Sequence, residues 1–421
     1  MKRHWLTALV ASLLCCAVEA QELTLYKDVV KELSSARYQG RGYARDGVRK
    51  AGKYIYKQFV SADADEVQMQ PFTLDVNTFP GKMRLSINGR RLTPGEEFTL
   101  REFSPAVKGE YPLYFIEGEG YDSERIFADL AKPAYKDAFV VCDFWEHYKH
   151  REDFARLENE EGLPIKGVVY TWKEPLKFYK ADAGRVAVRP VVWVMEDLIR
   201  DAQSLRIHVD NRFYDDYATD NVIARINGER HDSCYVFTAH YDHLGNLGRK
   251  VFYPGANDNA SGTAAIITLA KHYAQHQPKF DMVFVAFSGE DTNLHGSEWY
   301  VDHPIVPLDR IRYLFNIDMV GDDNPIQYVE VSDPGNEGFA LMESLNGENH
   351  YFKAFDHGKL AANSDHWPFA QKGVPCILFE NESGSAFPFY HTHHDDMEHF
   401  RTETYEPLFH LITEFIQAND N

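Results

Sequence analysis

Histidines and carboxylates follow several apolar segments of this 421-residue chain, and these are the side chains that could do chemistry. His240 and Asp242 come two positions apart, shortly after the apolar run 234–237. In an extended strand residues two apart share a face, and a metal-binding imidazole usually donates its other N–H to a carboxylate or carbonyl. Asp242 is therefore a candidate partner that orients His240. A single His-x-Asp pair is weak support for a metal site by itself.

A wider set of such residues points more strongly to metal chemistry. Asp258 precedes a predicted helix, Asp291 and Asp318 follow the apolar runs MVFVAF and YLFNI, and a histidine follows CILFE. Two histidines with three carboxylates suit two divalent metal ions with one carboxylate bridging; the five are His240, Asp258, Asp291, Asp318 and His391. Nitrogen and oxygen ligands without cysteine favour zinc, and manganese or cobalt would also fit. Glu290, next to one ligand, is then left to act on water.

The elements that carry these residues alternate between strand and helix from Asp220 onward. The runs NVIARI, CYVFTA, MVFVAF, YLFNI, YVEV and CILFE are apolar enough to predict strands buried on both faces. Helical segments lie between them, of which ASGTAAIITLAKHYAQ is the longest before the C-terminal helix. This alternation predicts an α/β fold, a three-layer sandwich with a mostly parallel central sheet. Ligands in such folds bind beyond the carboxyl ends of the strands, where the candidate residues lie.

The N-terminus has the plan of a secretory signal peptide. A basic start is followed by the apolar run LTALVASLLCCAV and by small residues before Gln21. The run is shorter than the ~20 residues that span a bilayer, so we expect cleavage near Ala20 and no stable membrane insertion. The mature protein is then exported, to the periplasm or the extracellular space.

The sequence pattern before Asp220 changes from helical to strand-like along the chain. The pattern is mostly helical up to about Pro80 and then changes to short strands separated by charged, Gly or Pro turns. We therefore predict a β-rich domain inserted into a larger catalytic domain. The predicted units are a signal peptide at 1–20, the N-terminal part of the catalytic domain at 21–80, the insert at 81–205 and the catalytic domain at 206–421.

Charge and cysteine content exclude some functions. The formal net charge is −20, from 64 acidic and 44 basic residues, so a nucleic-acid backbone would be repelled. Cys142, Cys234 and Cys376 lie in apolar, strand-like runs, which predicts buried thiols rather than a disulfide framework.

The motifs AHYDHLG, GANDNASGTAA, FSGEDTNLHGS, NIDMVG, SDHWPF and YHTHHDD resemble those of the secreted zinc aminopeptidases, the leucyl aminopeptidase type to which bacterial aminopeptidase S belongs. Glutamate carboxypeptidase, transferrin receptor and glutaminyl cyclase are relatives of that family. The resemblance implies that His240 and Asp318 bind one zinc ion, that Asp291 and His391 bind the other, and that Asp258 bridges them.

The same resemblance assigns further roles. Glu290 matches the general base and Asp242 the partner of the first histidine, and a cis peptide is expected between Asp258 and Asn259. Many relatives have two glutamates where this chain has Glu290 and Asp291, so this ligand is one methylene shorter. The insert resembles a protease-associated domain.

The activity that the resemblance implies is removal of N-terminal residues from peptides with a free amino terminus, with two zinc ions per chain. Alternatives are a carboxypeptidase or a glutaminyl cyclase on the same scaffold, or a non-catalytic receptor-like protein. A cyclase generally works with one zinc ion, and a carboxypeptidase needs a cation, for which Arg249, Lys250 and Lys372 are candidates. The sequence assigns neither the oligomeric state nor the preferred N-terminal residue.

Other polar residues near the motifs are predicted to do less. We expect His243, His393, His394 and His399 not to bind metal, and instead to contact the ligands or to be solvated. Four aspartates are predicted to be solvated turn residues: Asp322, Asp323, Asp395 and Asp396.

Overall fold

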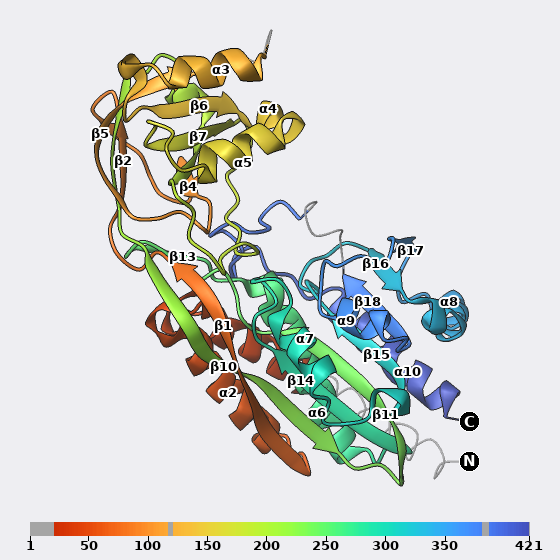
Figure 1. Ribbon diagram of the computed structural model, residues 1–421. Helices are drawn as coiled ribbons and strands as arrows, with labels where there is room; N and C mark the ends of the chain where they lie inside the picture. Colours follow the sequence, from red (N-terminus) through yellow and green to blue (C-terminus); the bar gives the residue numbers. More distant parts are fainter. Residues whose placement is uncertain (1–20, 117–120, 381–386, 421) are drawn as a thin grey trace, which may run out of the picture.

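The structure is a computed structural model that describes residues 21–116, 121–380 and 387–420 (Figure 1). The predicted signal peptide lies outside the described residues. Two eight-stranded sheets organise the chain, and each forms its own lobe with the helices that pack on it.

The first sheet has the strand order β1-β10-β14-β11-β15-β18-β16-β17. Its four central strands, β14, β11, β15 and β18, run parallel, while β1, β10 and β16 pair antiparallel to their inner neighbours. The predicted α/β fold is confirmed. The strands are β1 (Glu66–Thr78), β10 (Arg212–Ile226), β11 (Arg230–His240), β14 (Phe280–Phe287), β15 (Ile311–Ile317), β16 (Ile326–Val331), β17 (Ala354–His357) and β18 (Cys376–Glu380).

Helices cover both faces of this sheet because its central strands are apolar on both sides. Phe237 and Ala239 of β11 pack in the core on one face, while Val236 packs in the core on the other. The first face is covered by α2 (Gly47–Ser61), α6 (Gly262–Gln275) and α10 (Tyr405–Asn419). The second is covered by α7 (His295–Asp302) and α9 (His366–Gln371), and α8 (Asn336–Asn349) packs against α10.

The N-terminal part differs in one respect from the sequence-based expectation. Residues 21–33 are helical and α2 follows, as predicted, but residues 66–78 form the edge strand β1 instead of continuing a helical pattern. β1 pairs with β10, whose residues lie about 140 positions later in the chain. Tertiary pairing therefore overrides the local pattern here.

The second sheet uses the chain between β1 and β10 and has the order β3-β2-β9-β5-β6-β7-β8-β4. Its strands are β2 (Met83–Ile87), β3 (Arg90–Arg91), β4 (Phe98–Leu100), β5 (Val107–Phe115), β6 (Phe139–Asp143), β7 (Gly167–Trp172), β8 (Val191–Met195) and β9 (Ser204–Val209). Three helices that the strand-like texture did not predict belong to the same lobe: α3 (Ser123–Leu130), α4 (Phe144–Lys149) and α5 (Arg151–Asn159) (Figure 1). The lobe therefore contains helices as well as the predicted strands.

Two further expectations concern thiols and membranes. The three cysteines in the described residues are free and buried, as predicted. Among the helices that the structure describes, none has the length and apolar character needed to cross a bilayer.

Candidate metal centre

The sequence-predicted site residues meet at the carboxyl edge of the central strands. His240 ends β11, Asp318 follows β15, and Glu290 and Asp291 lie in the loop after β14. Two further residues reach the same place from loops: Asp258, from the irregular turn before α6, and His391, from the segment beyond β18. The parallel topology thus gathers residues from half of the chain.

Asp258 lies between the two histidines. Its Oδ1 is 3.3 Å from Nε2 of His240, and its Oδ2 is 3.2 Å from Nε2 of His391. Each carboxylate oxygen therefore faces a different imidazole, which is the geometry of a bridging ligand. The peptide between Asp258 and Asn259 is cis, as the resemblance implied.

Each histidine also has a second carboxylate close to its Nε2 atom. Asp318 Oδ1 is 3.4 Å from His240 Nε2, and Asp291 Oδ1 is 3.5 Å from His391 Nε2. Ser364 donates a hydrogen bond of 2.6 Å to Asp318 Oδ2, but the buried Oδ1 atom has no hydrogen-bond partner among the described residues. Buried carboxylate oxygens without donors are unfavourable, and a cation would satisfy this one. The donor set and this orphaned oxygen fit a pair of zinc ions.

His243 contacts two of the predicted ligands. Its side chain is buried, and its Nδ1 is 3.1 Å from Asp291 Oδ2 and 3.7 Å from Asp258 Oδ1. It therefore contacts two of the predicted ligand carboxylates, and the shorter contact is a hydrogen bond to Asp291. Such a contact orients the shorter acidic side chain at this position.

Asp242 connects three parts of the site. Its backbone carbonyl is 3.2 Å from Nδ1 of His240, closer than its carboxylate, which is 3.9 Å away. The carboxylate instead accepts hydrogen bonds from the Tyr43 hydroxyl, at 2.8 Å, and from the Glu290 backbone N–H, at 3.2 Å. Asp242 is thus placed to orient His240 and the loop that carries Glu290.

The pKa values of two neighbouring carboxyls are shifted in opposite directions. Burial raises the pKa of Glu290 well above its ordinary value, and the neighbouring Asp291 raises it further. Burial also acts to raise the pKa of Asp258, but the three imidazoles around it outweigh this effect and hold the pKa well below its usual range. Carboxyls whose pKa values are pushed apart in this way are suited to different roles, one as proton carrier and one as anionic ligand.

Arg41 and Asp395 support the Asp258 turn, and the sequence analysis missed both. The Arg41 side chain is fully buried, and one of its nitrogens donates to the carbonyls of Gly255 and Asp258 at 2.9 and 2.8 Å. Asp395 is 1% exposed and accepts hydrogen bonds from the backbone N–H of Asn257 and Asp258 at 2.7 and 2.8 Å. The prediction of a solvated turn residue is therefore wrong for Asp395, because its carboxylate satisfies the donors of a buried turn.

The other three aspartates predicted to be solvated turn residues differ in their exposure. Asp322 is also buried, contrary to the prediction, whereas Asp323 is exposed. Asp396 is partly exposed and accepts from the backbone N–H groups of Glu398 and His399, as a turn residue does.

The turn that carries Asp258 requires glycine at position 255. Gly255 has φ +60°, and a Cβ atom there would lie 2.1 Å from the Asp258 carbonyl oxygen and 2.5 Å from the His243 ring. No side chain fits without moving the turn.

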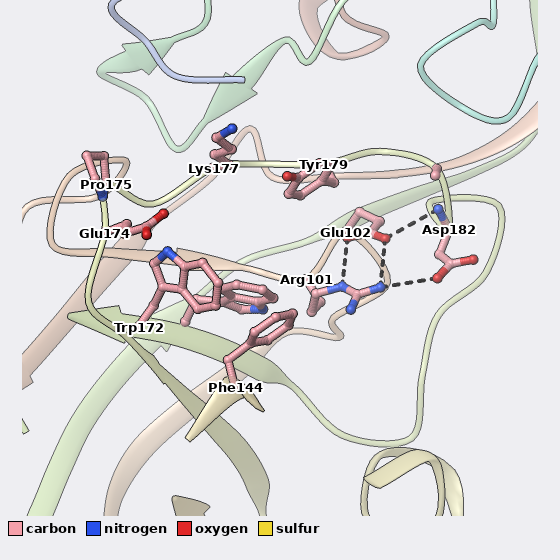
Figure 2. A pocket seen from close by; sticks show the side chains of 11 residues that line it. Arg101, Glu102, Phe144, Trp172, Glu174, Pro175, Lys177, Tyr179 and Asp182 are labelled. Atoms are coloured by element: carbon pink, nitrogen blue, oxygen red, sulfur yellow. Dashed lines mark hydrogen bonds and ion pairs between the residues drawn. The ribbon is translucent and has the colours of Figure 1, made fainter. Parts of the chain in front are cut away.

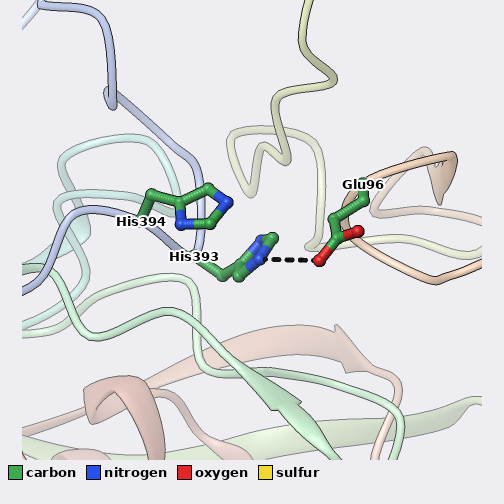
Figure 3. Close-up of side chains that lie close together, drawn as sticks. All are labelled: Glu96, His393 and His394. Carbon is green, nitrogen blue, oxygen red and sulfur yellow. Dashed lines mark ion pairs between the residues drawn. The ribbon is translucent and has the colours of Figure 1, made fainter.

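The other histidines of this region lie apart from the five predicted ligands. His393 Nε2 is 3.4 Å from Oε1 of Glu96, a residue of the inserted lobe, and His394 lies beside it (Figure 3). His399 Nδ1 is 3.1 Å from Asp396. These three therefore contact other partners than the Asp258 cluster.

A cavity of about 340 Å³ opens over the cluster. Within the described residues its lining includes four carboxylates and no lysine or arginine; the lining residues are Tyr179, His240, Asp258, Glu290, Asp318, Met319, Tyr328, Asn363, Glu380, Tyr390 and His391. Glu290 is 12% exposed and its Oε2 is 3.8 Å from His240 Nε2, so it faces the space in which a substrate would meet the cluster.

The chain is similar in sequence to known peptidases. Aminopeptidase YwaD of Bacillus subtilis is 29% identical over 283 residues, which cover 62% of this chain and 58% of that protein. A probable zinc metalloprotease of Pyrenophora tritici-repentis is 38% identical over 104 residues, which cover 24% of this chain and 22% of that protein. The chain thus spans little more than half of the first relative and less than a quarter of the second.

A solved structure extends the likeness to the fold of nearly the whole chain. BSAP, described as a zinc aminopeptidase from Bacillus subtilis, superimposes with a TM-score of 0.70 at 22% identity and covers 94% of both chains. The sequence profile of Peptidase family M28 matches residues 221–416, which carry all the predicted ligands. The resemblance inferred from the motifs is confirmed, since this segment of the chain is similar to Peptidase family M28.

Proposed function

We propose that this protein is a di-zinc aminopeptidase that removes N-terminal residues from peptides. The observation that carries the proposal is the Asp258 carboxylate, whose two oxygens face two histidines while Asp318 and Asp291 flank the pair. The relatives named as zinc aminopeptidase or zinc metalloprotease support the choice of metal.

The chain's own residues divide the work. His240 and Asp318 would hold one zinc ion, His391 and Asp291 the other, and Asp258 both. When bound, such a pair supplies Lewis acidity that makes water more acidic and polarises a carbonyl oxygen. Glu290 takes the proton from water as it attacks the peptide carbonyl, and it then delivers that proton to the leaving amine. Asp242 keeps this base in place through the Glu290 backbone N–H.

The charge of the cavity favours a free amino terminus over a free carboxylate. Of the four carboxylates that line the cavity, Glu380 is neither a proposed zinc ligand nor the proposed base, so it attracts a substrate ammonium and repels a substrate carboxylate. None of the three cations considered for a carboxypeptidase is among the lining residues, and Lys372 lies 3.9 Å from Asp302 instead. This arrangement disfavours carboxypeptidase action.

The activity is tested with aminoacyl p-nitroanilides and with peptides whose N-terminus is either free or acetylated. We expect hydrolysis of the free forms only, loss of activity on chelation with recovery on adding zinc, and two zinc ions per chain by elemental analysis. Glu290→Gln should reduce kcat by at least about a hundredfold while zinc content stays at two, because the base is lost and the ligands are kept.

Other outcomes would point to the alternatives. Conversion of an N-terminal glutaminyl peptide to its cyclic form without hydrolysis would indicate a cyclase, and release of C-terminal residues a carboxypeptidase. A zinc-free chain without turnover would indicate a binding protein. Unchanged turnover in Glu290→Gln would refute the assigned base.

Export is part of the same proposal. The basic and apolar N-terminal residues support cleavage near Ala20 and a periplasmic or extracellular location. N-terminal sequencing of the protein recovered outside the cytoplasm should begin at Gln21. A mature chain that retains Met1 would contradict it.

A further inference from the structure

A second cavity, of about 590 Å³, lies in the inserted lobe (Figure 2). Its volume is within the range of pockets that bind small molecules or side chains. The lining residues are Arg101, Glu102, Phe144, Trp172, Glu174, Pro175, Lys177, Tyr179, Ala181, Asp182 and Trp193. None of them is used by the proposed reaction.

One side of this cavity is a cluster of aromatic rings. The ring centroids of Phe144 and Trp172 are 4.6 Å apart at 84°, and those of Phe144 and Trp193 are 4.8 Å apart at 41°. Edge-to-face and tilted arrangements of this kind readily accept a further ring. Trp193 is 8% exposed, so most of its ring packs within this aromatic cluster.

The charged residues at one end of the cavity are paired with one another. Arg101 contacts Glu102 at 3.2 Å and Asp182 at 3.2 Å, and Glu102 also accepts from the Asp182 backbone N–H (Figure 2). One cation is therefore matched by two carboxylates. An anionic ligand is disfavoured in this cavity, and an apolar ligand fits its aromatic side.

This cavity adjoins the cavity over the metal centre, because Tyr179 lines both. The Tyr179 ring centroid is 4.9 Å from that of His391, and the neighbouring Phe178 N–H donates to the His391 carbonyl at 3.0 Å. Lys180, next along this segment, donates to the Asn77 carbonyl at 3.0 Å. The segment after β7 is thus fixed to the catalytic lobe on one side and forms the cavity on the other.

We infer that this cavity binds an aromatic side chain of the peptide substrate, on the carboxyl side of the bond that is cut. The inference rests on the proposed aminopeptidase function. In an aminopeptidase only the terminal residue lies before the scissile bond, so the rest of the peptide must leave the metal centre over a neighbouring surface. The cavity that shares Tyr179 provides such a surface, and its aromatic side selects among peptides by their later residues.

The test uses the full mature protein loaded with zinc. Hexapeptides share one N-terminal residue, and a single Phe or Ala is placed in turn at positions 2 to 6 of an otherwise glycine chain. Release of the first residue gives kcat and KM, and the p-nitroanilide of the same N-terminal amino acid serves as a substrate too short to reach the cavity.

We expect Phe to lower KM about tenfold relative to Ala at one position or two adjacent ones, as burial of an aromatic side chain does. Trp172→Ala should abolish this preference and leave hydrolysis of the p-nitroanilide unchanged, which also shows that the variant is folded. Trp172→Leu, a smaller change, should weaken the preference if the alanine variant is unstable. Tyr148→Ala is the matched control, because Tyr148 is 63% exposed on α4 and does not line the cavity.

Two results would overturn the inference in different ways. Hydrolysis of the short substrate with no preference for Phe at any position, or with a preference that Trp172→Ala retains, refutes the inference and leaves the proposed function standing. No hydrolysis of any substrate refutes the proposed function and the inference with it.

Discussion

Arg41 is predicted to be essential for the stability of the metal centre although it does not contact the metal ligands through their side chains. Its guanidinium makes five hydrogen bonds, all to backbone carbonyls, and the side chain is fully buried. The acceptors are Tyr241 at 2.9 Å, Leu33 at 3.3 Å, Pro254 at 2.6 Å, Gly255 at 2.9 Å and Asp258 at 2.8 Å. The side chain thus connects the N-terminal segment, the end of β11 and the Asp258 turn.

Replacement by methionine keeps much of the volume and removes every donor. Each buried hydrogen bond contributes about 1 kcal/mol, so losing five is expected to lower the free energy of unfolding by about 3–5 kcal/mol. The loss also removes a positive charge beside four buried carboxylates, those of Asp258, Asp395, Asp291 and Asp242. Because the Asp258 turn loses its support, zinc affinity should fall about 10- to 100-fold.

The assay combines urea unfolding of the metal-free protein with zinc titration of the folded protein. Arg41→Lys should be intermediate, because an ammonium has three donors and lacks the planar fork. Arg45→Met is the matched control: Arg45 is exposed, donates to the Pro80 carbonyl at 3.1 Å, and its loss should change stability by no more than about 0.5 kcal/mol. If Arg41→Met unfolds at the wild-type urea concentration and binds zinc as tightly, the support assigned to this side chain is refuted.

Three further predictions concern the neighbouring structure. Burial lowers the pKa of Lys180 to about 8, so the unfolded chain binds more protons between about pH 8 and 10.5. The stability of the wild type should therefore rise across that window by about 3 kcal/mol relative to Lys180→Met, and parallel pH profiles in urea unfolding would contradict this. Gly255→Ala should abolish binding of two zinc ions, because its Cβ would overlap the Asp258 carbonyl oxygen, and full zinc content by elemental analysis would refute the steric argument. The buried thiols, of which Cys234 has its pKa raised to about 12 by burial, should react with a disulfide reagent only after unfolding, and rapid reaction of the native protein would be the contrary result.

The sequence alone predicts those strands whose apolar pattern agrees with their burial in the fold. The runs that became β11, β14 and β15 are apolar at successive positions, and the structure buries alternate residues against opposite helical layers. Polar residues directly after such strands can only lie at the edge of the sheet. For this reason His240 and Asp318 could be placed together without a structure.

The residues that the sequence analysis missed depend on contacts between distant segments. Nothing near Asp395 distinguishes it from an ordinary turn aspartate, and its role arises from two N–H groups about 137 positions earlier in the chain. Arg41 likewise lies about 200 positions before most of the carbonyls it satisfies. The pattern around Arg41 predicts only a mostly helical segment and gives no sign of these contacts.

The N-terminal segment also determines how the proposed base is held. Burial raises the pKa of Asp242 to about 6, while the Tyr43 hydroxyl and the Glu290 backbone N–H stabilise its charged form. Burial also raises the pKa of Tyr43 well above its ordinary value, so this phenol stays a donor at neutral pH. Tyr43 therefore helps His240 and the Glu290 N–H to favour the charged form of Asp242. A movement of the N-terminal segment would disturb the first histidine and the base together, since both depend on the same carboxylate.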